Sequence, residues 1–224
     1  MREINITDLD GKAHSIDLDN LGNQALHIDC MELMRALPDK CFELSIVDPP
    51  YGIGINHNMG RRKGDRHSEY AKVEWDYQPP TQEYFDELMR VSQNQVIWGA
   101  NYFTMPPTKC FIVWRKPQIS ETLSFSMLEY AWASFNSTSK EWIGMSAEID
   151  RIHPTQKPSE LYSWILQMFA HKGDRILDTH LGSGSSRIAA WQAGYDFLGC
   201  EIDKDYFEQG CKRYESYACQ YKLF

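Results

Sequence analysis

The stretch SIVDPPY, residues 45–51, is a short apolar run that ends in an acid, two prolines and an aromatic ring. The apolar run is too short for a helix and is typical of a buried strand in a parallel sheet. The prolines cannot extend that strand, because proline lacks the N–H group that pairs neighbouring strands. We therefore expect Asp48 and Tyr51 on a stiff turn beyond the carboxyl end of a strand, where open α/β sheets bind ligands.

The chemical groups of this turn suit a planar amine. The Asp48 carboxylate and the Pro49 carbonyl are two neighbouring acceptors, which can accept both hydrogens of an exocyclic amine. The ring of Tyr51 offers a stacking face for a flat base. A proline turn with an incidental Asp cap and a packed Tyr would contain the same residues, so the rest of the chain has to distinguish the two interpretations.

Length and composition indicate an ordinary globular protein. The 224 residues, 42% hydrophobic and 24% charged, suffice for one domain with a substantial core. No apolar run approaches the ~20 residues of a membrane span and the start lacks the core of a signal peptide, so we expect a cytoplasmic protein without membrane contact. The six cysteines form no Cys-x-x-Cys pair, which gives no indication of a metal site. The net charge of −8 argues against non-specific coating of nucleic acid, although it allows a local basic surface.

Strand patterns alternate with helix patterns along the chain. Strands are expected at residues 25–28, 43–47, 95–99, 110–114, 129–135, 175–178 and 195–199. Helices are expected at residues 31–37, 81–90, 158–169 and 186–193, and from residue 203 onward. Regular patterning is weak in residues 1–23 (a short hairpin or arm), 52–76 (a long loop) and 137–151 (polar and irregular). The alternation predicts a doubly wound α/β fold with a mostly parallel sheet.

Residues 176–201 are typical of a nucleotide-binding strand–helix–strand unit. Gly182 and Gly184 let the backbone approach a ligand at a helix N-terminus, and Glu201, a little over ~20 residues after the strand begins, suits ribose hydroxyls. Arg187 stands where a dinucleotide fingerprint has its third glycine, and no P-loop sequence follows. We therefore expect an adenosine-type cofactor without a pyrophosphate. Asp29, at another strand end, can accept from an adenine amino group or simply cap the next helix.

Three sequence motifs occur in a characteristic order: DPPY at residues 48–51, HPTQKP at 153–158, and a Gly-rich strand turn at 178–184. Together they resemble the DNA amino-methyltransferases of the permuted beta class, over most of residues 25–215. The resemblance implies a single domain, 1–224, with a seven-stranded Rossmann-like sheet and a circularly permuted motif order. It also implies S-adenosylmethionine as cofactor, S-adenosylhomocysteine as product, no metal, and double-stranded DNA as substrate.

The resemblance also implies roles for individual residues. The catalytic turn is Asp48, Pro49, Pro50 and Tyr51. The expected cofactor contacts are Asp29, Cys30, Asp48, His153, Thr155, Gln156, Lys157, Asp178, His180, Leu181, Gly182, Ser183, Gly184 and Glu201. The family usually has Asp-Pro-Phe before its Gly-rich turn, whereas this chain has DTHL at residues 178–181, so we expect His180 to replace the aromatic contact.

The implied reaction is methyl transfer to an exocyclic amine of a flipped base that stacks on Tyr51. Adenine N6 is the expected target, because the family associates Asp at this position mostly with adenine, and cytosine N4 is the alternative. Methylation at cytosine C5 would need a Pro-Cys nucleophile, and no cysteine of this sequence follows a proline. Enzymes that methylate protein glutamine resemble the turn but carry Asn in place of Asp48, which disfavours an RNA or protein amine as substrate.

Basic residues predict where DNA phosphates bind. The expected contacts are Arg61, Arg62, Lys63 and Arg66 in the loop 52–76, and Arg115 and Lys116 after a strand end. A solvated surface loop is the alternative interpretation of residues 52–76.

Residues 137–152 form only a short variable segment where the family has a sizeable recognition region. We therefore expect a short, degenerate recognition site, or a homodimer or a recognition partner chain that shares the task. A non-catalytic subunit that binds cofactor or DNA for a larger modification assembly is the alternative function.

Overall fold

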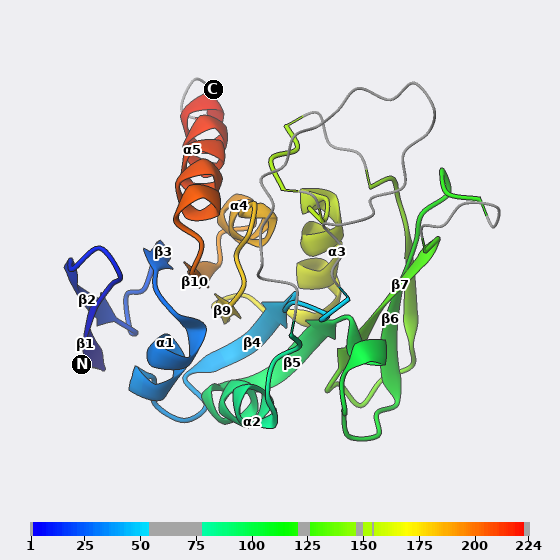
Figure 1. The fold of residues 1–224 in the computed structure, drawn as a ribbon, viewed down its shortest axis with the longest axis horizontal. Helices are drawn as coiled ribbons and strands as arrows, with labels where there is room; N and C mark the ends of the chain where they lie inside the picture. The colour runs from blue at the N-terminus through cyan, green and yellow to red at the C-terminus, as the bar shows by residue number, and fades with distance from the viewer. Residues whose placement is uncertain (1, 54–77, 121–125, 147–149, 154, 222–224) are drawn as a thin grey trace.

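A computed structural model describes residues 2–53, 78–120, 126–146, 150–153 and 155–221. Within these residues eight strands form one sheet in the order β3-β10-β9-β4-β5-β7-β6-β8 (Figure 1). The strands are β3 (Asn23–His27), β4 (Phe42–Val47), β5 (Ser92–Trp98), β6 (Cys110–Arg115), β7 (Leu128–Ala133), β8 (Lys140–Ile143), β9 (Arg175–Asp178) and β10 (Asp196–Glu201). Neighbouring strands from β3 to β5 are parallel, and β7 is antiparallel to both β5 and β6.

The predicted mostly parallel, Rossmann-like α/β sheet is confirmed, with one strand more than the seven expected. The extra strand, β8, lies in the segment expected to be irregular and pairs in parallel with β6. Its Trp142 packs against Trp114 of β6 at 6.0 Å between ring centroids. A four-residue strand with two charged residues has too little periodicity to be recognised in the sequence.

Helices cover both faces of the sheet because the strands alternate their side chains between the faces. One apolar cluster joins Val47 of β4 to α1 (Cys30–Ala36) and α2 (Gln82–Val91). The other joins Leu44 and Ile46 to α3 (Ser159–Phe169) and α4 (Ser185–Gln192). The last helix, α5 (Lys204–Tyr221), packs beside β10, β3 and α4. Among the described helices, none combines the length and apolar character that crossing a membrane requires.

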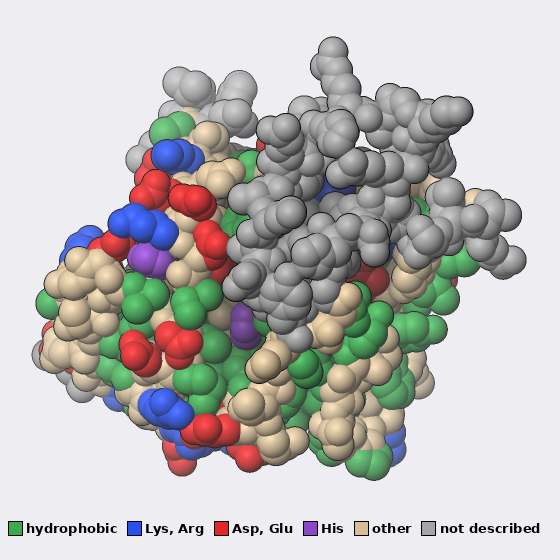
Figure 2. Space-filling model, in the orientation of Figure 1, with side chains coloured by type: hydrophobic (Ala, Val, Ile, Leu, Met, Phe, Trp, Pro, Cys, Tyr) green, Lys and Arg blue, Asp and Glu red, His purple; other side chains and the backbone are tan. Residues whose placement is uncertain are grey.

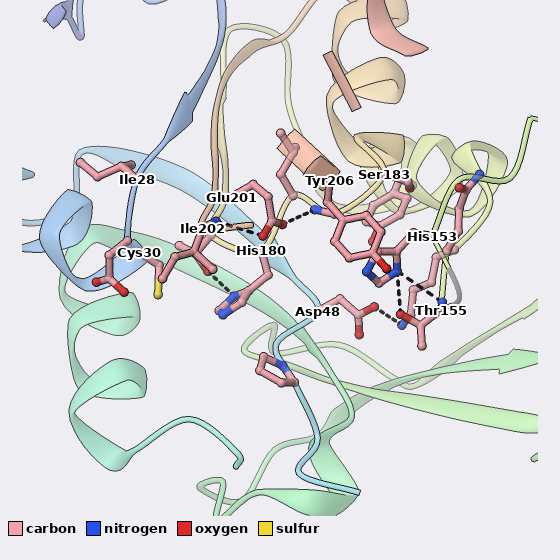
Figure 3. A pocket seen from close by; sticks show the side chains of 18 residues that line it. Ile28, Cys30, Asp48, His153, Thr155, His180, Ser183, Glu201, Ile202 and Tyr206 are labelled. Carbon is pink, nitrogen blue, oxygen red and sulfur yellow. Dashed lines mark hydrogen bonds and ion pairs between the residues drawn. The ribbon is translucent and has the colours of Figure 1, made fainter. Parts of the chain in front are cut away.

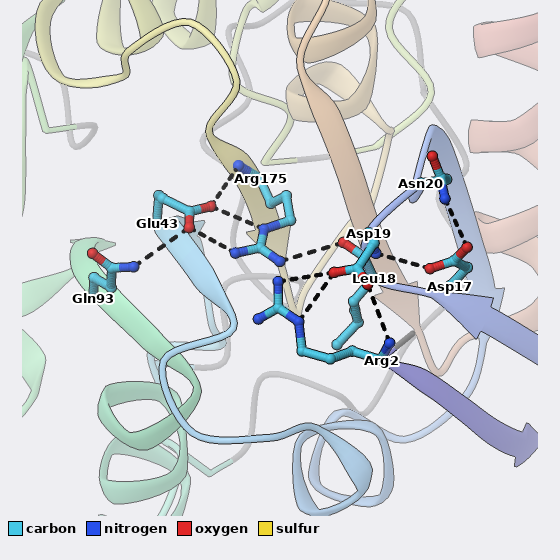
Figure 4. Close-up of polar contacts among 8 residues, drawn as sticks. All are labelled: Arg2, Asp17, Leu18, Asp19, Asn20, Glu43, Gln93 and Arg175. Carbon is cyan, nitrogen blue, oxygen red and sulfur yellow. Dashed lines mark hydrogen bonds and ion pairs between the residues drawn. The ribbon is translucent and has the colours of Figure 1, made fainter.

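The N-terminal segment forms the expected hairpin, with β1 (Glu3–Thr7) antiparallel to β2 (Ala13–Asp17). Polar contacts fasten the chain after this hairpin to the sheet (Figure 4). Arg175, at the start of β9, donates to Glu43 at the start of β4 (2.7 Å) and to the Leu18 carbonyl (3.3 Å). These contacts lie at the amino ends of the parallel strands. The opposite edge, where β4, β9 and β10 end, is therefore open for a ligand.

Candidate functional site

A pocket of about 390 Å³ lies where β4, β9 and β10 end, and Figure 3 shows Asp48, His180 and Glu201 around it. Many of the predicted site residues line it: Asp29, Cys30, Asp48, Pro50, His153, Thr155, Gln156, Lys157, His180, Leu181, Gly182, Ser183 and Glu201. Five lining residues were not predicted: Ile28, Tyr162, Thr179, Ile202 and Tyr206. The motifs from both halves of the sequence thus meet in one pocket.

Two predicted cofactor residues, Asp178 and Gly184, do not line the pocket but support the turn that does. Asp178 is buried, and its carboxylate accepts from the backbone N–H of His180 (3.0 Å) and from Ser186 Oγ (2.5 Å). Burial raises the pKa of Asp178 to about 7. Gly184 caps α4 with φ 75°, and a Cβ there would lie 3.4 Å from the carbonyl oxygen of Gly210. Both residues therefore fix the turn, whereas its pocket surface comes from residues 181–183.

Acceptors occupy one end of the pocket. Glu201 accepts from the backbone N–H of Gly182 (2.8 Å) and also from those of Ile202 and Asp203, so it ties the Gly-rich turn to the end of β10. Asp29 caps α1 by accepting from the backbone N–H of Met31 (2.8 Å), and it lines the pocket as well. Asp29 therefore caps the helix, as one interpretation of the sequence predicted, and its place in the pocket leaves the other, an acceptor for an adenine amino group, possible as well.

His180 is a neutral imidazole in the pocket wall. Burial lowers its pKa to about 4, and its ring lies edge-on to Tyr84 at 5.2 Å. Its Nδ1 lies 3.1 Å from Thr179 Oγ1, which in turn lies 2.7 Å from the hydroxyl of Tyr84. The side chain thus occupies an aromatic setting at the end of β9, the position where the family resemblance places a phenylalanine.

His153 and residues 155–157 form another wall of the pocket. The His153 ring lies edge-on to Tyr206 at 4.3 Å, and its Nδ1 accepts from the backbone N–H of Thr155 (3.3 Å). Burial lowers the pKa of His153 to about 3, so this ring is also neutral near pH 7. Gln156 Oε1 accepts from the Ile152 backbone N–H (2.9 Å) and closes the segment on itself.

Arg213 of α5, which was not among the predicted site residues, ties Asp150, which precedes this wall in the sequence, to the Gly-rich turn. Its guanidinium donates to the Ser183 carbonyl (3.1 Å), to Ser185 Oγ (2.9 Å) and to Asp150 Oδ2 (2.6 Å). The Arg213 side chain is buried, and the ion pair lowers the pKa of Asp150 despite partial burial of that carboxyl. An arginine inside a helix carries no motif, so only the tertiary structure reveals this role.

Asp48 carries an ion pair as well as a hydrogen bond. Tyr51 donates its hydroxyl to Asp48 Oδ1 (2.7 Å), and Lys157 donates to Asp48 Oδ2 (2.5 Å). Strand alternation places Asp48 on the same face as Ile46, the face that α3 covers, and Lys157 lies just before α3. Burial raises the pKa of Asp48, although the ammonium of Lys157 opposes the shift. Lys157, expected only as a cofactor contact, is thus also the counter-ion of Asp48.

The ring of Tyr51 is half-buried against the protein. It stacks on Tyr102 with centroids 5.1 Å apart and lies against Gly99, where a Cβ would come within 2.1 Å of the ring. Neither Tyr51 nor Pro49 lines the pocket. Tyr51 thus contacts Asp48 of its own turn and stacks on Tyr102, which follows β5 and was not among the predicted site residues.

The candidate phosphate contacts have different surroundings in the structure. Arg61, Arg62, Lys63 and Arg66 lie outside the described residues. Arg115 donates to Glu141 at 2.8 Å on the exposed edge of the sheet. Lys116 does not face solvent as a phosphate contact would, because its side chain is 11% exposed and pairs with Glu129. On the face shown in Figure 2, acidic and basic side chains are interspersed over the left-hand part of the molecule.

Comparison with known proteins finds DNA methylases among the similar sequences. The model of the N6/N4 DNA methylase family matches residues 106–212. The putative methylase YubD of Escherichia coli K12 is 25% identical over 207 residues, which cover 83% of this chain and 87% of that protein. The type II methyltransferase M2.DpnII of Streptococcus pneumoniae is 39% identical over 64 residues, 29% of this chain and 24% of that protein.

Two solved structures share the fold. The M1.HpyAVI–SAM complex has a TM-score of 0.56 at 20% identity, covering 85% of this chain and 98% of that chain. The cytosine-N4-specific PvuII DNA methyltransferase has a TM-score of 0.59 at 13% identity, covering 90% of this chain and 92% of that chain.

Proposed function

We propose that this chain, which belongs to the N6/N4 DNA methylase family, transfers a methyl group from S-adenosylmethionine to the N6 amine of a flipped adenine in DNA. The observation that carries the proposal is that Asp48 and the Gly-rich turn, residues 181–183, line one pocket. An amine held at Asp48 and a methyl donor held at the turn would therefore meet within the same cavity.

The residues present fit the cofactor. Asp29 and Glu201 put two carboxylates at one end of the pocket, which suits the amino group and hydroxyls of an adenosine. Gly182 has φ 50° and no side chain, so its backbone would allow a ligand to approach closely. His153 and Tyr206 add neutral rings, which are compatible with a sulfonium cation. The cofactor supplies an electrophilic methyl group, and residues of the protein orient the amine and accept its proton.

Asp48 acts on the amine. The nitrogen is a poor nucleophile because its lone pair is delocalised into the base. Asp48 and the Pro49 carbonyl, by accepting from its N–H bonds, favour a pyramidal nitrogen with a localised lone pair. Bound S-adenosylmethionine would supply the methyl group and keep the electron pair of the broken S–C bond, while the amine nitrogen would gain positive charge and then give up one proton. Burial raises the pKa of the Asp48 carboxyl group. Its carboxylate is the proton acceptor next to this nitrogen.

Adenine is the proposed base because Asp at position 48 goes mostly with adenine in the family that the sequence resembles. Cytosine N4 is the second candidate, because the same two acceptors serve either amine and the PvuII enzyme, which shares the fold, is cytosine-N4-specific. The amino group is inaccessible inside a duplex, so the base has to leave the stack. We assign the phosphate contacts to Arg61, Arg62, Lys63 and Arg66, and the choice of site to the short segment 137–152.

Purified protein incubated with methyl-labelled S-adenosylmethionine and unmodified DNA tests this proposal. We expect label in the DNA from the wild type and loss of at least 10²-fold in rate for Asp48→Ala, because a transition-state acceptor is removed. Calorimetry of cofactor binding accompanies both proteins. Cofactor binding without any methylated nucleoside would favour the alternative of a non-catalytic subunit.

A further inference from the structure

Glu129 of β7 lies between two lysines beside the candidate catalytic turn. Its Oε2 lies 3.2 Å from Lys157 Nζ, and its Oε1 accepts from Lys116 Nζ. β7 pairs Glu129 with Trp114 of β6, which directs the carboxylate to the face that α3 covers. The charged groups thus follow the order Asp48, Lys157, Glu129, Lys116, with alternating sign.

Aromatic rings lie beside both ammonium groups. Lys157 Nζ lies 5.6 Å from the ring centroid of Tyr51 and 5.2 Å from that of Trp98, and its side chain is 3% exposed. Lys116 Nζ lies 4.6 Å from the ring centroid of Trp114. Rings provide weak cation–π attraction but no lone pairs, so carboxylates must compensate the charge of a buried ammonium. Lys157 has two of them, one on either side.

The charge balance decides what Glu129 contributes. Asp48 and Lys157 alone form a neutral pair, which offers little stabilisation to the positive charge that develops on the amine. Glu129 returns the nearest three groups to a net charge of −1. Lys116 compensates Glu129 from the other carboxylate oxygen, farther along the chain of charges from Asp48.

We propose that Glu129 is a positioning residue for the methyl transfer: it holds Lys157 between two carboxylates, so that Asp48 keeps negative potential and acceptor capacity for the target amine. The proposal rests on the proposed function. It assigns to Glu129 no contact with cofactor, since Glu129 does not line the pocket.

The pH profile separates this role from a merely structural ion pair. The titratable groups facing Asp48 are Lys157 from the segment before α3, Tyr51 of its own turn, Glu129 of β7 and, through charge, Asp178 of β9. The negative charge of Glu129 raises the pKa of Asp48. Removing that charge therefore lowers the pKa of Asp48, and the acid limb of kcat/KM, which reports its ionisation, moves to lower pH.

The test compares Glu129→Gln with Glu129→Asp and Glu43→Gln in methyl transfer to unmodified DNA across pH. For Glu129→Gln we expect kcat to fall on the order of 10-fold, which is less than the roughly 10²–10³-fold loss on removing a group that contacts the transition state. The acid limb of kcat/KM should move to lower pH, and the Kd of the cofactor should not change. Glu129→Asp keeps the charge and should return the acid limb to its wild-type position. Glu43→Gln breaks a similarly buried ion pair, 25% exposed against 23% for Glu129, at the other end of β4, and should leave kcat and the acid limb unchanged.

Lys116→Met provides a test of opposite sign. It removes the positive charge that offsets the Glu129 carboxylate, so the acid limb of kcat/KM should move to higher pH. If Glu129→Gln does not fold under the assay conditions, the Lys116→Met result tests the proposal alone. The proposal is overturned if an active wild type and a folded Glu129→Gln share one acid limb, or if the Lys116→Met limb stays in place. A wild type that methylates no DNA overturns the proposed function and this proposal together.

Discussion

Lys157 Nζ lies 2.5 Å from Asp48 Oδ2, so two residues 109 positions apart in the sequence form one ion pair at the candidate active site. The pair joins the HPTQKP segment to the DPPY turn. It holds the Asp48 carboxylate in place where the α3 face of the sheet meets the pocket. The same lysine therefore belongs both to the pocket wall and to the candidate catalytic turn.

Lys157→Met should destabilise the protein strongly. The substitution preserves much of the side-chain volume but leaves Asp48 and Glu129 without their shared cation in a buried setting. Breaking a buried pair in this way typically costs about 3–5 kcal/mol in the free energy of unfolding. Urea denaturation at pH 7 measures the loss, with the exposed pair removed by Arg2→Met as a control that costs little. A Lys157→Met protein as stable as the Arg2→Met protein would contradict the assigned ion pair.

Gly99→Ala should disturb the site through Tyr51. Gly99 has φ 72°, and an added Cβ would come within 2.1 Å of the Tyr51 ring, which would have to leave Tyr102. We expect a loss of about 2–4 kcal/mol in stability, from backbone strain plus displaced packing, together with reduced methyl transfer.

Gly194→Ala is the matched control for this substitution. Gly194 has nearly the same φ, 74°, but its added Cβ meets nothing within 4 Å. It should lose only the ~1–2 kcal/mol of left-handed backbone and keep its activity. Equal losses at Gly99 and Gly194 would show that the Tyr51 packing contributes nothing.

His180 should make the protein less stable in mild acid. Its pKa is about 4 in the folded protein against an ordinary value of 6.5, because burial disfavours the charged ring. Between these values the unfolded chain binds a proton that the folded chain does not, so stability falls as pH drops from about 6.5 to 4. His180→Asn should flatten this part of the pH dependence of urea denaturation, whereas exposed His171→Asn should not. Identical curves for wild type and His180→Asn would contradict the neutral, buried imidazole.

The sequence predicted the fold and most of the pocket because those features depend on local pattern. Short apolar runs that end in Asp48, Asp178 and Glu201 specify parallel strands, and parallel strands bring their carboxyl ends together. The partners of those residues depend on tertiary structure instead. Nothing local distinguishes Glu129 from other strand carboxylates, or Tyr206 from other helical tyrosines, so their roles become visible only in the folded chain.

The most direct measurement is nucleoside analysis of DNA, grown without adenine or cytosine methylation, after incubation with the protein and S-adenosylmethionine. Digestion to nucleosides and mass spectrometry identify the methylated atom independently of the recognition sequence. We predict N6-methyladenine from the wild type and none from Asp48→Ala. N4-methylcytosine in its place would contradict the adenine assignment, and DNA without any methylated nucleoside, despite bound cofactor, would contradict the proposed activity itself.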